Sequence, residues 1–245
     1  IIYSFNIRVV KEMNVRTQWI GFTTLLRKET WRFLRIWGQS LVPPAITTIL
    51  YFVIFGRIIG SQIHPIDGYT YVQFILPGLL MIGLINSAYM NSSGTFFGAK
   101  FGKHIEEILM SPMKDDFILL GYVISSAFRG ILVGLIVAVI GLFFTKLHLQ
   151  HVLIVVLVGF LTATLFALAG LINGIYARKF DDISIVPTFI LTPLTYLGGV
   201  FYPIKALPSF WQHVSLFNPV VYIIDAFRYG MLGLHSVNVW YCLLA

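Results

Sequence analysis

The feature that most constrains this chain is a series of apolar runs, each about as long as a helix that crosses a lipid bilayer. Such a helix needs about 20 residues, and runs of about this length or longer cover residues 41–59, 71–97, 117–144, 152–176 and 183–201. A membrane interior offers no water to backbone amide groups, so each run is expected to be helical. Only 11% of the 245 residues are charged, whereas soluble domains hold about 25%. The sequence therefore predicts an all-α polytopic membrane protein.

A basic amphipathic segment precedes the first run. Lys28, Arg32 and Arg35 recur at helical spacing and therefore share one face of a helix. Another face carries mostly apolar and aromatic side chains at the same spacing, namely Leu26, Thr30, Phe33 and Trp37. We expect residues 23–37 to form an interfacial helix that lies in the membrane surface. Residues 1–22 are expected to be an N-terminal segment, with Met13 as an alternative start, and residues 23–245 a single transmembrane domain.

Prolines break the apolar sequence that follows the fifth run. Residues 203–235 contain no clean stretch of about 20 apolar residues, so short re-entrant helices are expected there. A last apolar run begins at Val237 and stops at Ala245, which is too short to span. We expect this run to be a sixth span that is truncated in the sequence.

Basic residues are unevenly divided between the two sides that this topology creates. Twelve lie on one side, in the segment before the first run, in the connection between the second and third runs, and in that between the fourth and fifth runs. Four lie on the opposite side. Cytoplasmic loops of membrane proteins carry the excess of Lys and Arg. The N-terminus is therefore expected in the cytoplasm and residues 203–235 outside.

Several function classes are disfavoured by what the sequence lacks. The basic residues behind the formal net charge of +7 occupy short loops rather than a stripe on a soluble domain, which argues against nucleic-acid binding. The sequence has no G-x-x-x-x-G-K-[ST] loop for ATP and no H-E-x-x-H metal motif. A lone Cys242 excludes an intrachain disulfide. His213, Asp225 and Arg228 come closest to a catalytic group, and an interfacial role is preferred for each. We expect no catalytic, cofactor-binding or metal-binding residue.

Only one charged residue lies clearly inside a predicted span, away from its ends. All ten acids are expected in loops or termini, which disfavours ion-driven transport because that mechanism uses intramembrane acids. Arg129, in the third run, is the exception. It either lines a path for an amphipathic substrate or bonds backbone carbonyl groups of a neighbouring helix, and the sequence does not decide between the two.

The connection between the second and third runs combines apolar and acidic residues. Ile105, Ile108 and Leu109 are expected to form an apolar patch beside Glu106 and Glu107 on a short helix. Such a helix outside the membrane is suited to docking into a groove of a partner protein. The alternative is an ordinary connector with some helix and some charge.

Several segments together resemble the permease subunits of the ABC-2 type transporter family. The strongest is residues 191–230, where the fifth run ends in GGVFYP and is followed by further prolines, by NP and by RYG. This outer motif consists of Pro203, Pro208, Asn218, Pro219, Asp225 and Arg228. The Pro43-Pro44 pair, the sequence FILPG near the start of the second run and the Glu106-Glu107 pair also match.

The resemblance implies an exporter fold of six spans in a bacterial inner membrane, with two permease subunits, here expected as a homodimer, and two separate ATPase subunits. The partner ATPases would bind ATP and Mg, so this chain would be neither an enzyme nor a cofactor-binding protein. The interfacial helix and the 100–116 connection would contact them. Family members export drugs, polysaccharides, lipids or other molecules, and the sequence decides neither among these nor between pairing with itself and with a paralogue. An ion-coupled secondary transporter and a non-transporting membrane scaffold are the alternatives.

Overall fold

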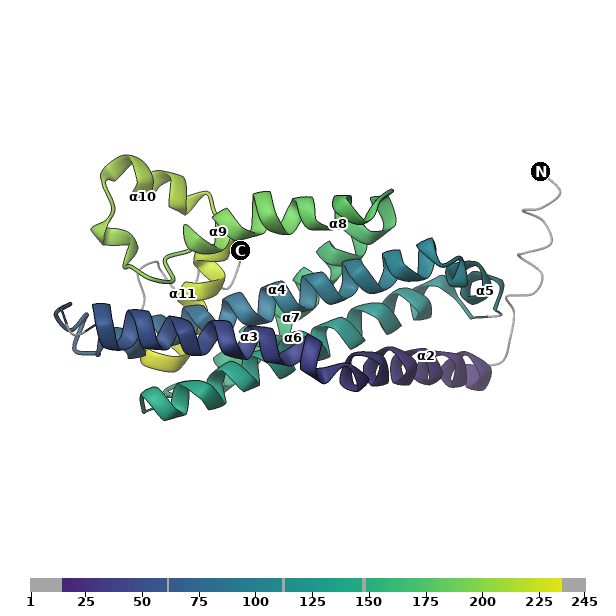
Figure 1. Ribbon diagram of the computed structural model, residues 1–245, viewed down its shortest axis with the longest axis horizontal. Coiled ribbons are helices and arrows are strands. Elements are labelled where there is room, and N and C mark those ends of the chain that lie inside the picture. The colour runs from purple at the N-terminus through teal and green to yellow at the C-terminus, as the bar shows by residue number, and fades with distance from the viewer. Residues whose placement is uncertain (1–14, 61, 112, 147–148, 235–245) are drawn as a thin grey trace.

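The computed structural model describes residues 15–60, 62–111, 113–146 and 149–234, so Met13 and the run from Val237 lie outside the described residues. The long helices follow the long axis of the molecule (Figure 1). The elements, in chain order, are α2 (Val15–Arg35), α3 (Trp37–Tyr51), η1 (Phe52–Ile59), α4 (Tyr71–Phe101), α5 (His104–Met110), α6 (Asp115–Phe144), α7 (Val152–Tyr176), α8 (Phe180–Val186), η2 (Pro187–Leu191), α9 (Thr192–Tyr196), η3 (Ile204–Ala206), α10 (Ser209–Leu216) and α11 (Pro219–Leu232). Of the three η segments, η1 and η2 are π-helical and η3 is a 3₁₀ turn.

Four helices in the described part of the chain are long and apolar enough to cross a membrane: Trp37–Gly56, α4, α6 and α7. The predicted boundaries of the fourth run, 152–176, agree with α7, whereas the first span begins at Trp37 rather than at residue 41. At about 1.5 Å per residue, the 31 residues of α4 reach about 45 Å, which exceeds the ~30 Å hydrocarbon core. The ends of α4 therefore extend beyond the apolar layer.

The fifth predicted run differs from the structure at both ends. Its helix begins at Phe180, because Asp182 Oδ2 accepts the backbone N–H groups of Arg178 and Lys179 at 2.8 and 3.1 Å. It ends at Tyr196 rather than at residue 201, and Gly199 then adopts a left-handed conformation with φ +71°. α8, η2 and α9 follow one another without a break, so residues 180–196 form one helical segment with a π-helical turn in its middle.

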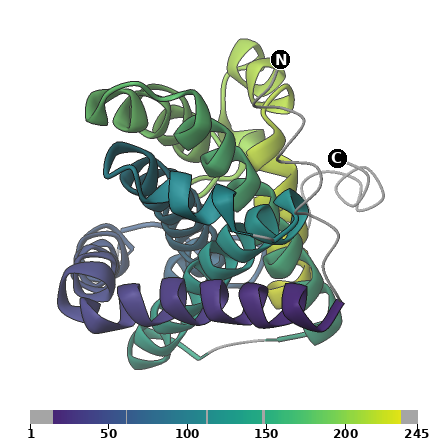
Figure 2. The same cartoon turned by 90° about the vertical axis from the view of Figure 1, so that its right-hand side faces the viewer.

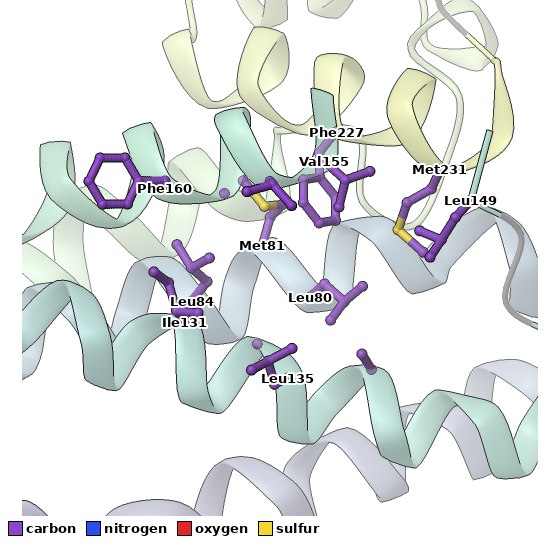
Figure 3. Close-up of a pocket in the computed structure, with 14 residues that line it drawn as sticks. Leu80, Met81, Leu84, Ile131, Leu135, Leu149, Val155, Phe160, Phe227 and Met231 are labelled. Atoms are coloured by element: carbon purple, nitrogen blue, oxygen red, sulfur yellow. The ribbon is translucent and has the colours of Figure 1, made fainter. Parts of the chain in front are cut away.

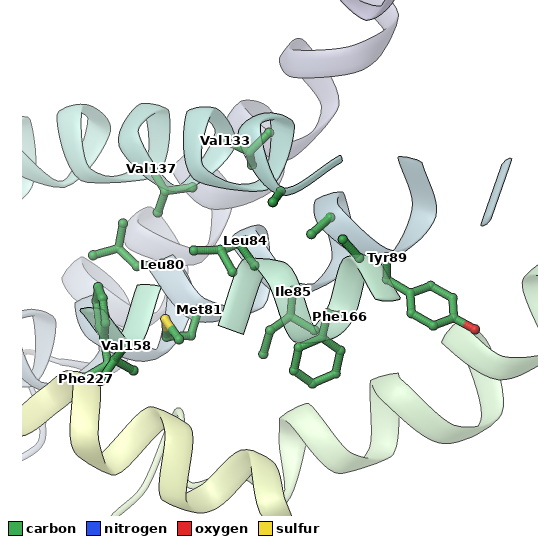
Figure 4. Packing of buried hydrophobic residues seen from close by; sticks show 14 of the residues in the cluster. Leu80, Met81, Leu84, Ile85, Tyr89, Val133, Val137, Val158, Phe166 and Phe227 are labelled. Carbon is green, nitrogen blue, oxygen red and sulfur yellow. The ribbon is translucent and has the colours of Figure 1, made fainter. Parts of the chain in front are cut away.

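α4 is the central helix of the bundle. It packs most extensively against α7 and α6, and α11 also contacts it. Figure 4 shows the buried cluster at this junction, in which Met81 and Ile85 of α4 face Val158 and Phe166 of α7. By contrast α3, α6 and α7 keep most of their apolar surface exposed. In a bilayer that surface faces lipid or another membrane helix.

One end of the bundle gathers the connections that carry most of the basic residues. In Figure 1 this is the right-hand end, where α2, α5 and the turn between α7 and α8 lie. Lys100 Nζ donates to the carbonyl oxygens of Ile175 and Ala177 at 2.7 and 2.9 Å, which joins the ends of α4 and α7. The backbone N–H of Lys114 donates to Gln18 Oε1 of α2 at 2.8 Å. Figure 2 shows α2 crossing one edge of the bundle at this end.

The opposite end joins the 62–70 loop to the segment after α9. The hydroxyl group of Tyr69 donates to the carbonyl oxygen of Leu232 at 2.8 Å, and that of Tyr71 donates to the carbonyl oxygen of Phe201, also at 2.8 Å. α10 lies at this end in Figure 1. The loops that were predicted to share a side of the membrane therefore do share an end of the bundle.

Glycines bring the backbone of α7 directly against α4. A Cβ atom at Gly170 would lie 2.3 Å from the carbonyl oxygen of Tyr89, and one at Gly174 would lie 2.9 Å from that of Ser93. Neither distance is tolerated, so these positions need glycine for close approach. Gly98 also lies inside a helix, α4, but a Cβ atom there would meet open space.

We predict that Gly170→Ala lowers the thermal stability of the detergent-solubilised protein. Overpacking costs about 1–3 kcal/mol, which corresponds to a fall in Tm of about 5 °C. Gly98→Ala is the matched control, and it should leave Tm unchanged or raise it because Ala favours helix over Gly by up to about 1 kcal/mol. Equal Tm values for the two variants would show that the α4–α7 contact is looser than the structure has it.

Candidate functional site

A groove of about 420 Å³ runs between α2 and α5 at the basic end of the bundle. Glu107, Ile108 and Lys28 line it, so one acid and one apolar residue of the predicted docking patch face a basic residue of the predicted amphipathic helix. Leu109 and Glu106 are exposed. Ile105 is not, because it is buried in the hydrophobic core. The predicted patch is therefore divided, with Ile105 anchoring α5 and the other residues presented outside.

The face of α2 that packs against the other helices shares only Phe33 with the apolar face that was predicted to lie in the membrane surface. The residues it buries are Gln18, Phe22, Leu25, Glu29 and Phe33. α2 packs along α6, where Gly121 admits Leu25 and Phe117 contacts Phe22. Because α6 accepts this stripe, Trp37 is left 63% exposed and Leu26 is only half-buried.

One member of the predicted basic stripe of α2 also contacts a neighbouring helix. Lys28, Arg32 and Arg35 are all exposed, but Arg32, whose side chain is 45% exposed, also hydrogen-bonds the Thr95 hydroxyl group of α4 and forms an ion pair with Glu29 at 3.1 Å. The Glu29 side chain is buried, so the expectation that every acid lies in a loop or terminus is wrong for it. Burial raises the pKa of Glu29 above its usual value, and the nearby charges of Arg32 and Lys28 only partly oppose this shift.

A second groove, of about 380 Å³, lies among α3, α4 and α6 at the depth of the candidate spans. Its polar lining is unusual in so apolar a chain, and it includes Ser40, Thr47, Thr48, Asn86, Ser87 and Arg129. Arg129, the one charge predicted inside a span, is thus placed at a hollow rather than against lipid.

Arg129 also makes contacts that a structural residue would make. Its Nη1 atom donates to Asn91 Oδ1 of α4 at 3.0 Å, and its Nη2 atom donates to the carbonyl oxygen of Ser40 of α3 at 3.3 Å. Asn91 in turn donates to Ser126 Oγ of α6 at 3.0 Å. The two readings of Arg129 are therefore not exclusive, because the same side chain lines a groove and joins three helices.

The outer motif is held together by a buried arginine. Arg228 of α11, 3% exposed, donates through Nη2 to the carbonyl oxygen of Gly199 at 2.7 Å, and its guanidinium carbon lies 4.1 Å from the centre of the Phe74 ring. Asp225 lies 3.9 Å from Arg228 Nη1. Asp225 is also buried, so it is the second acid that lies in neither a loop nor a terminus.

The other members of the outer motif begin short helices. Asn218 caps α11 by accepting the backbone N–H of Val220 at 3.0 Å, and it donates to the carbonyl oxygen of Leu194 at 2.6 Å. Pro219 occupies the first turn of α11, where its missing N–H is harmless. Pro203 and Pro208 directly precede η3 and α10. Each of these residues therefore has a structural role at the start of a short helix.

His213 does not complete a catalytic group with Asp225 and Arg228 in this arrangement. Its Nδ1 atom lies 2.7 Å from the carbonyl oxygen of Ser209 on its own helix, α10. Among the described residues no cluster of His, Cys, Asp and Glu is arranged to hold a metal ion.

A third hollow is almost entirely apolar. It has a volume of about 340 Å³ and lies among α4, α6, α7 and α11. In Figure 3, Leu80 and Leu84 of α4 lie between Leu135 of α6 and the α7 and α11 residues Val155 and Phe227. With no polar group to bind or transfer a proton, this hollow has no evident chemistry of its own.

Sequence reasoning missed three residues that the structure makes important. Glu29 was not singled out, although its spacing of four from Leu25 and from Phe33 indicated the buried face. Asn91 was not singled out either. Thr95 carried no signal at all, because a threonine inside an apolar helix gives no indication of its partner.

Comparison with known proteins places these features in one family. The family model described as ABC-2 type transporter matches residues 21–232. The chain is 52% identical over 219 residues to the inner membrane transport permease YadH of Escherichia coli (strain K12), an alignment that covers 89% of this chain and 86% of that protein. It is 24% identical over 192 residues to nodulation protein J of Rhizobium leguminosarum bv. viciae, covering 78% of this chain and 74% of that protein.

The buried Glu29 yields a pH-dependent prediction. A carboxyl group whose pKa is raised by folding stabilises the folded state at pH values below its unfolded pKa, and this contribution is lost as the pH rises through the folded pKa. Glu29→Gln should therefore raise Tm by about 3 °C at pH 8 and leave it unchanged at pH 4, which lies below the ordinary carboxyl pKa of 4.5. Thermal unfolding in detergent at both pH values measures this. A lower Tm for Glu29→Gln at pH 8 would mean that the ion pair with Arg32 outweighs the cost of burial.

Proposed function

The chain belongs to the ABC-2 type transporter family, and from that premise we propose that it is the permease subunit of an ATP-driven exporter. It moves an amphipathic, lipid-like, saccharide or drug substrate out of the cytoplasm, using ATP that a separate subunit hydrolyses. The 52% identity to an inner membrane transport permease over 89% of the chain is the observation that carries this proposal. Residues 203–235 form the outer re-entrant cap, and six spans per subunit assemble into a homodimer.

The groove between α2 and α5 is the docking site for the ATPase in this proposal. Both elements lie at the basic end of the bundle (Figure 1), beyond the apolar surface of the spans. The exposed Glu106 and Leu109 stand beside this groove on α5, and Glu107 lines it. A helix or loop of a partner that enters here would touch charged and apolar groups together, which favours a defined orientation.

The arrangement of basic residues supports an orientation for the chain. The end that holds α2, α5 and the turn between α7 and α8 carries Lys28, Lys100, Lys114 and Arg178. Since the cytoplasmic side of a membrane protein carries the excess of basic residues, this end faces the cytoplasm. The ATPase, which needs cytoplasmic ATP, would then meet α2 and α5 directly.

Accessibility of single cysteines tests the orientation. In a Cys242→Ser background, Lys205→Cys should react with a membrane-impermeant thiol reagent in intact cells, because α10 and the turn before it lie at the outer end. Lys103→Cys, at the start of α5, should react only after the cells are permeabilised. The reverse pattern would overturn the orientation and, with it, the proposed docking face.

Co-purification tests the function and its docking site together. A tagged wild-type chain should retain an ATP-hydrolysing subunit, and the pair in vesicles should show ATP-dependent transport. Reversal of both acids, Glu106→Lys with Glu107→Lys, should reduce retention by about tenfold or more while the chain still inserts, because unpaired charges would face the partner. Lys205→Glu, a charge reversal at the opposite end, is the control and should have no effect. Normal retention by the double variant would exclude α5 as the docking element, and absence of any ATPase from the wild-type complex would contradict the function.

A further inference from the structure

We propose that the groove among α3, α4 and α6 binds the acidic head group of an amphiphile, with Arg129 as its principal ligand. This inference rests on the proposed transport function and specifies the substrate class: a phosphate or carboxylate group joined to an apolar chain. The proposal rests on what lines this one groove at membrane depth: an arginine without a carboxylate partner, two serine hydroxyl groups without a hydrogen-bond partner among the described residues, and several apolar side chains.

Arg129 has no carboxylate partner among the residues that the structure describes. Its two hydrogen-bond partners, Asn91 Oδ1 and the carbonyl oxygen of Ser40, are both neutral. Charged residues within membrane spans are costly and pair with an opposite charge or face a hydrated path. The nearby Arg32, which contacts Thr95 one helical turn from Asn91 along α4, is a second cation and adds to the positive charge at this depth. Glu29 pairs with Arg32 and leaves the charge of Arg129 unbalanced.

Arg129 and Arg228 each have a buried Nε atom without a hydrogen-bond partner among the described residues, but only Arg228 has a carboxylate group nearby, that of Asp225. The bond from Arg129 Nη2 to the carbonyl oxygen of Ser40 is also long, at 3.3 Å. The guanidinium group thus retains donor capacity in a fork geometry that matches phosphate and carboxylate oxygens. An acid group in the groove would take up this capacity.

Two serine hydroxyl groups add donors at the same place. Ser40 and Ser87 are 3% and 7% exposed, both line the groove, and the Oγ atom of each lacks a hydrogen-bond partner among the described residues. Buried hydroxyl groups are ordinarily hydrogen-bonded. Ser40 also provides the carbonyl oxygen that Arg129 Nη2 binds, and Ser87 lies one helical turn from Asn91, the other partner of Arg129, so both hydroxyl groups belong to the part of the groove that holds Arg129.

Part of the groove wall is suited to an alkyl chain. Pro43 of α3 and Leu79, Ile82 and Met90 of α4 line it without polar groups. Tyr51 lies towards one end of the α3 wall, and its hydroxyl group pairs with that of Tyr196 at 2.8 Å. A ligand with both an acid group and a chain fits this surface better than a free anion, which gains nothing from the apolar wall.

Native mass spectrometry of the full-length chain in detergent tests the proposal without the ATPase. The probes are oleoyl lysophosphatidic acid, monoolein, which lacks the phosphate, and glycerol phosphate, which lacks the chain. The wild-type chain should bind the first at least about tenfold more tightly than either of the others.

Arg129→Gln should weaken the binding of lysophosphatidic acid by at least about tenfold and Arg129→Lys by less, because Lys keeps the charge but loses the planar fork of donors. Arg35→Gln, which changes an exposed arginine outside the groove, should alter it less than about twofold.

Ser87→Asp provides a second test that does not remove Arg129. The new carboxylate would occupy the donors of Arg129 and repel the acid group, so binding of lysophosphatidic acid should fall at least about tenfold while binding of monoolein is unchanged. Equal affinity for lysophosphatidic acid and monoolein, or equal losses in Arg129→Gln and Arg35→Gln, would overturn the proposal. So would full binding by a folded Ser87→Asp variant. Because no ATPase takes part, a chain that binds the probe but retains no ATPase would refute only the proposed function.

Discussion

The close approach of α7 to α4 at Gly170 is the contact on which the placement of the other helices depends. Membrane helices gain little by leaving lipid for one another, so their association relies on dispersion contacts and on hydrogen bonds between backbones and side chains that come very near. Gly170 and Gly174 remove the side chains that would keep the two helices apart. Gly130 does the same for α6, where a Cβ atom would lie 2.8 Å from Ala88 Cβ. With both neighbours seated this closely, α4 is buried along most of its length and α11 packs beside it.

Three buried or half-buried arginines are accommodated in three different ways. Arg228 is enclosed by Asp225, the carbonyl oxygen of Gly199 and the Phe74 ring, so it fixes the segment after α9 against α4. Arg32 is paired with Glu29 and bound to Thr95, which joins α2 to α4. Arg129 has only neutral partners among the residues described, whereas each of the other two arginines has a carboxylate group within 4 Å. Since an unsatisfied charge is costly at this depth, Arg129 is the one of the three whose environment calls for a ligand.

Only a few contacts connect the proposed ATPase-docking end with the proposed ligand groove. α2 lines the docking groove through Lys28 and, one turn later, binds Thr95 through Arg32. Thr95 lies one turn from Asn91, the partner of Arg129. A displacement of α2 by a docked partner would therefore reach the groove through two side-chain hydrogen bonds and one turn of α4.

The sequence by itself determined the fold class, four of the apolar helices and the region of the outer motif, because the length and apolarity of a run decide whether a helix is able to span a bilayer. It also identified Arg129 as exceptional. Only the tertiary structure decided that the fifth run ends at Tyr196, that α2 buries Glu29 rather than Leu26 and Thr30, and that Asp225 lies inside the molecule. These features depend on which residue of a neighbouring helix stands opposite. Periodicity along one helix specifies its faces but not the partner that covers each of them.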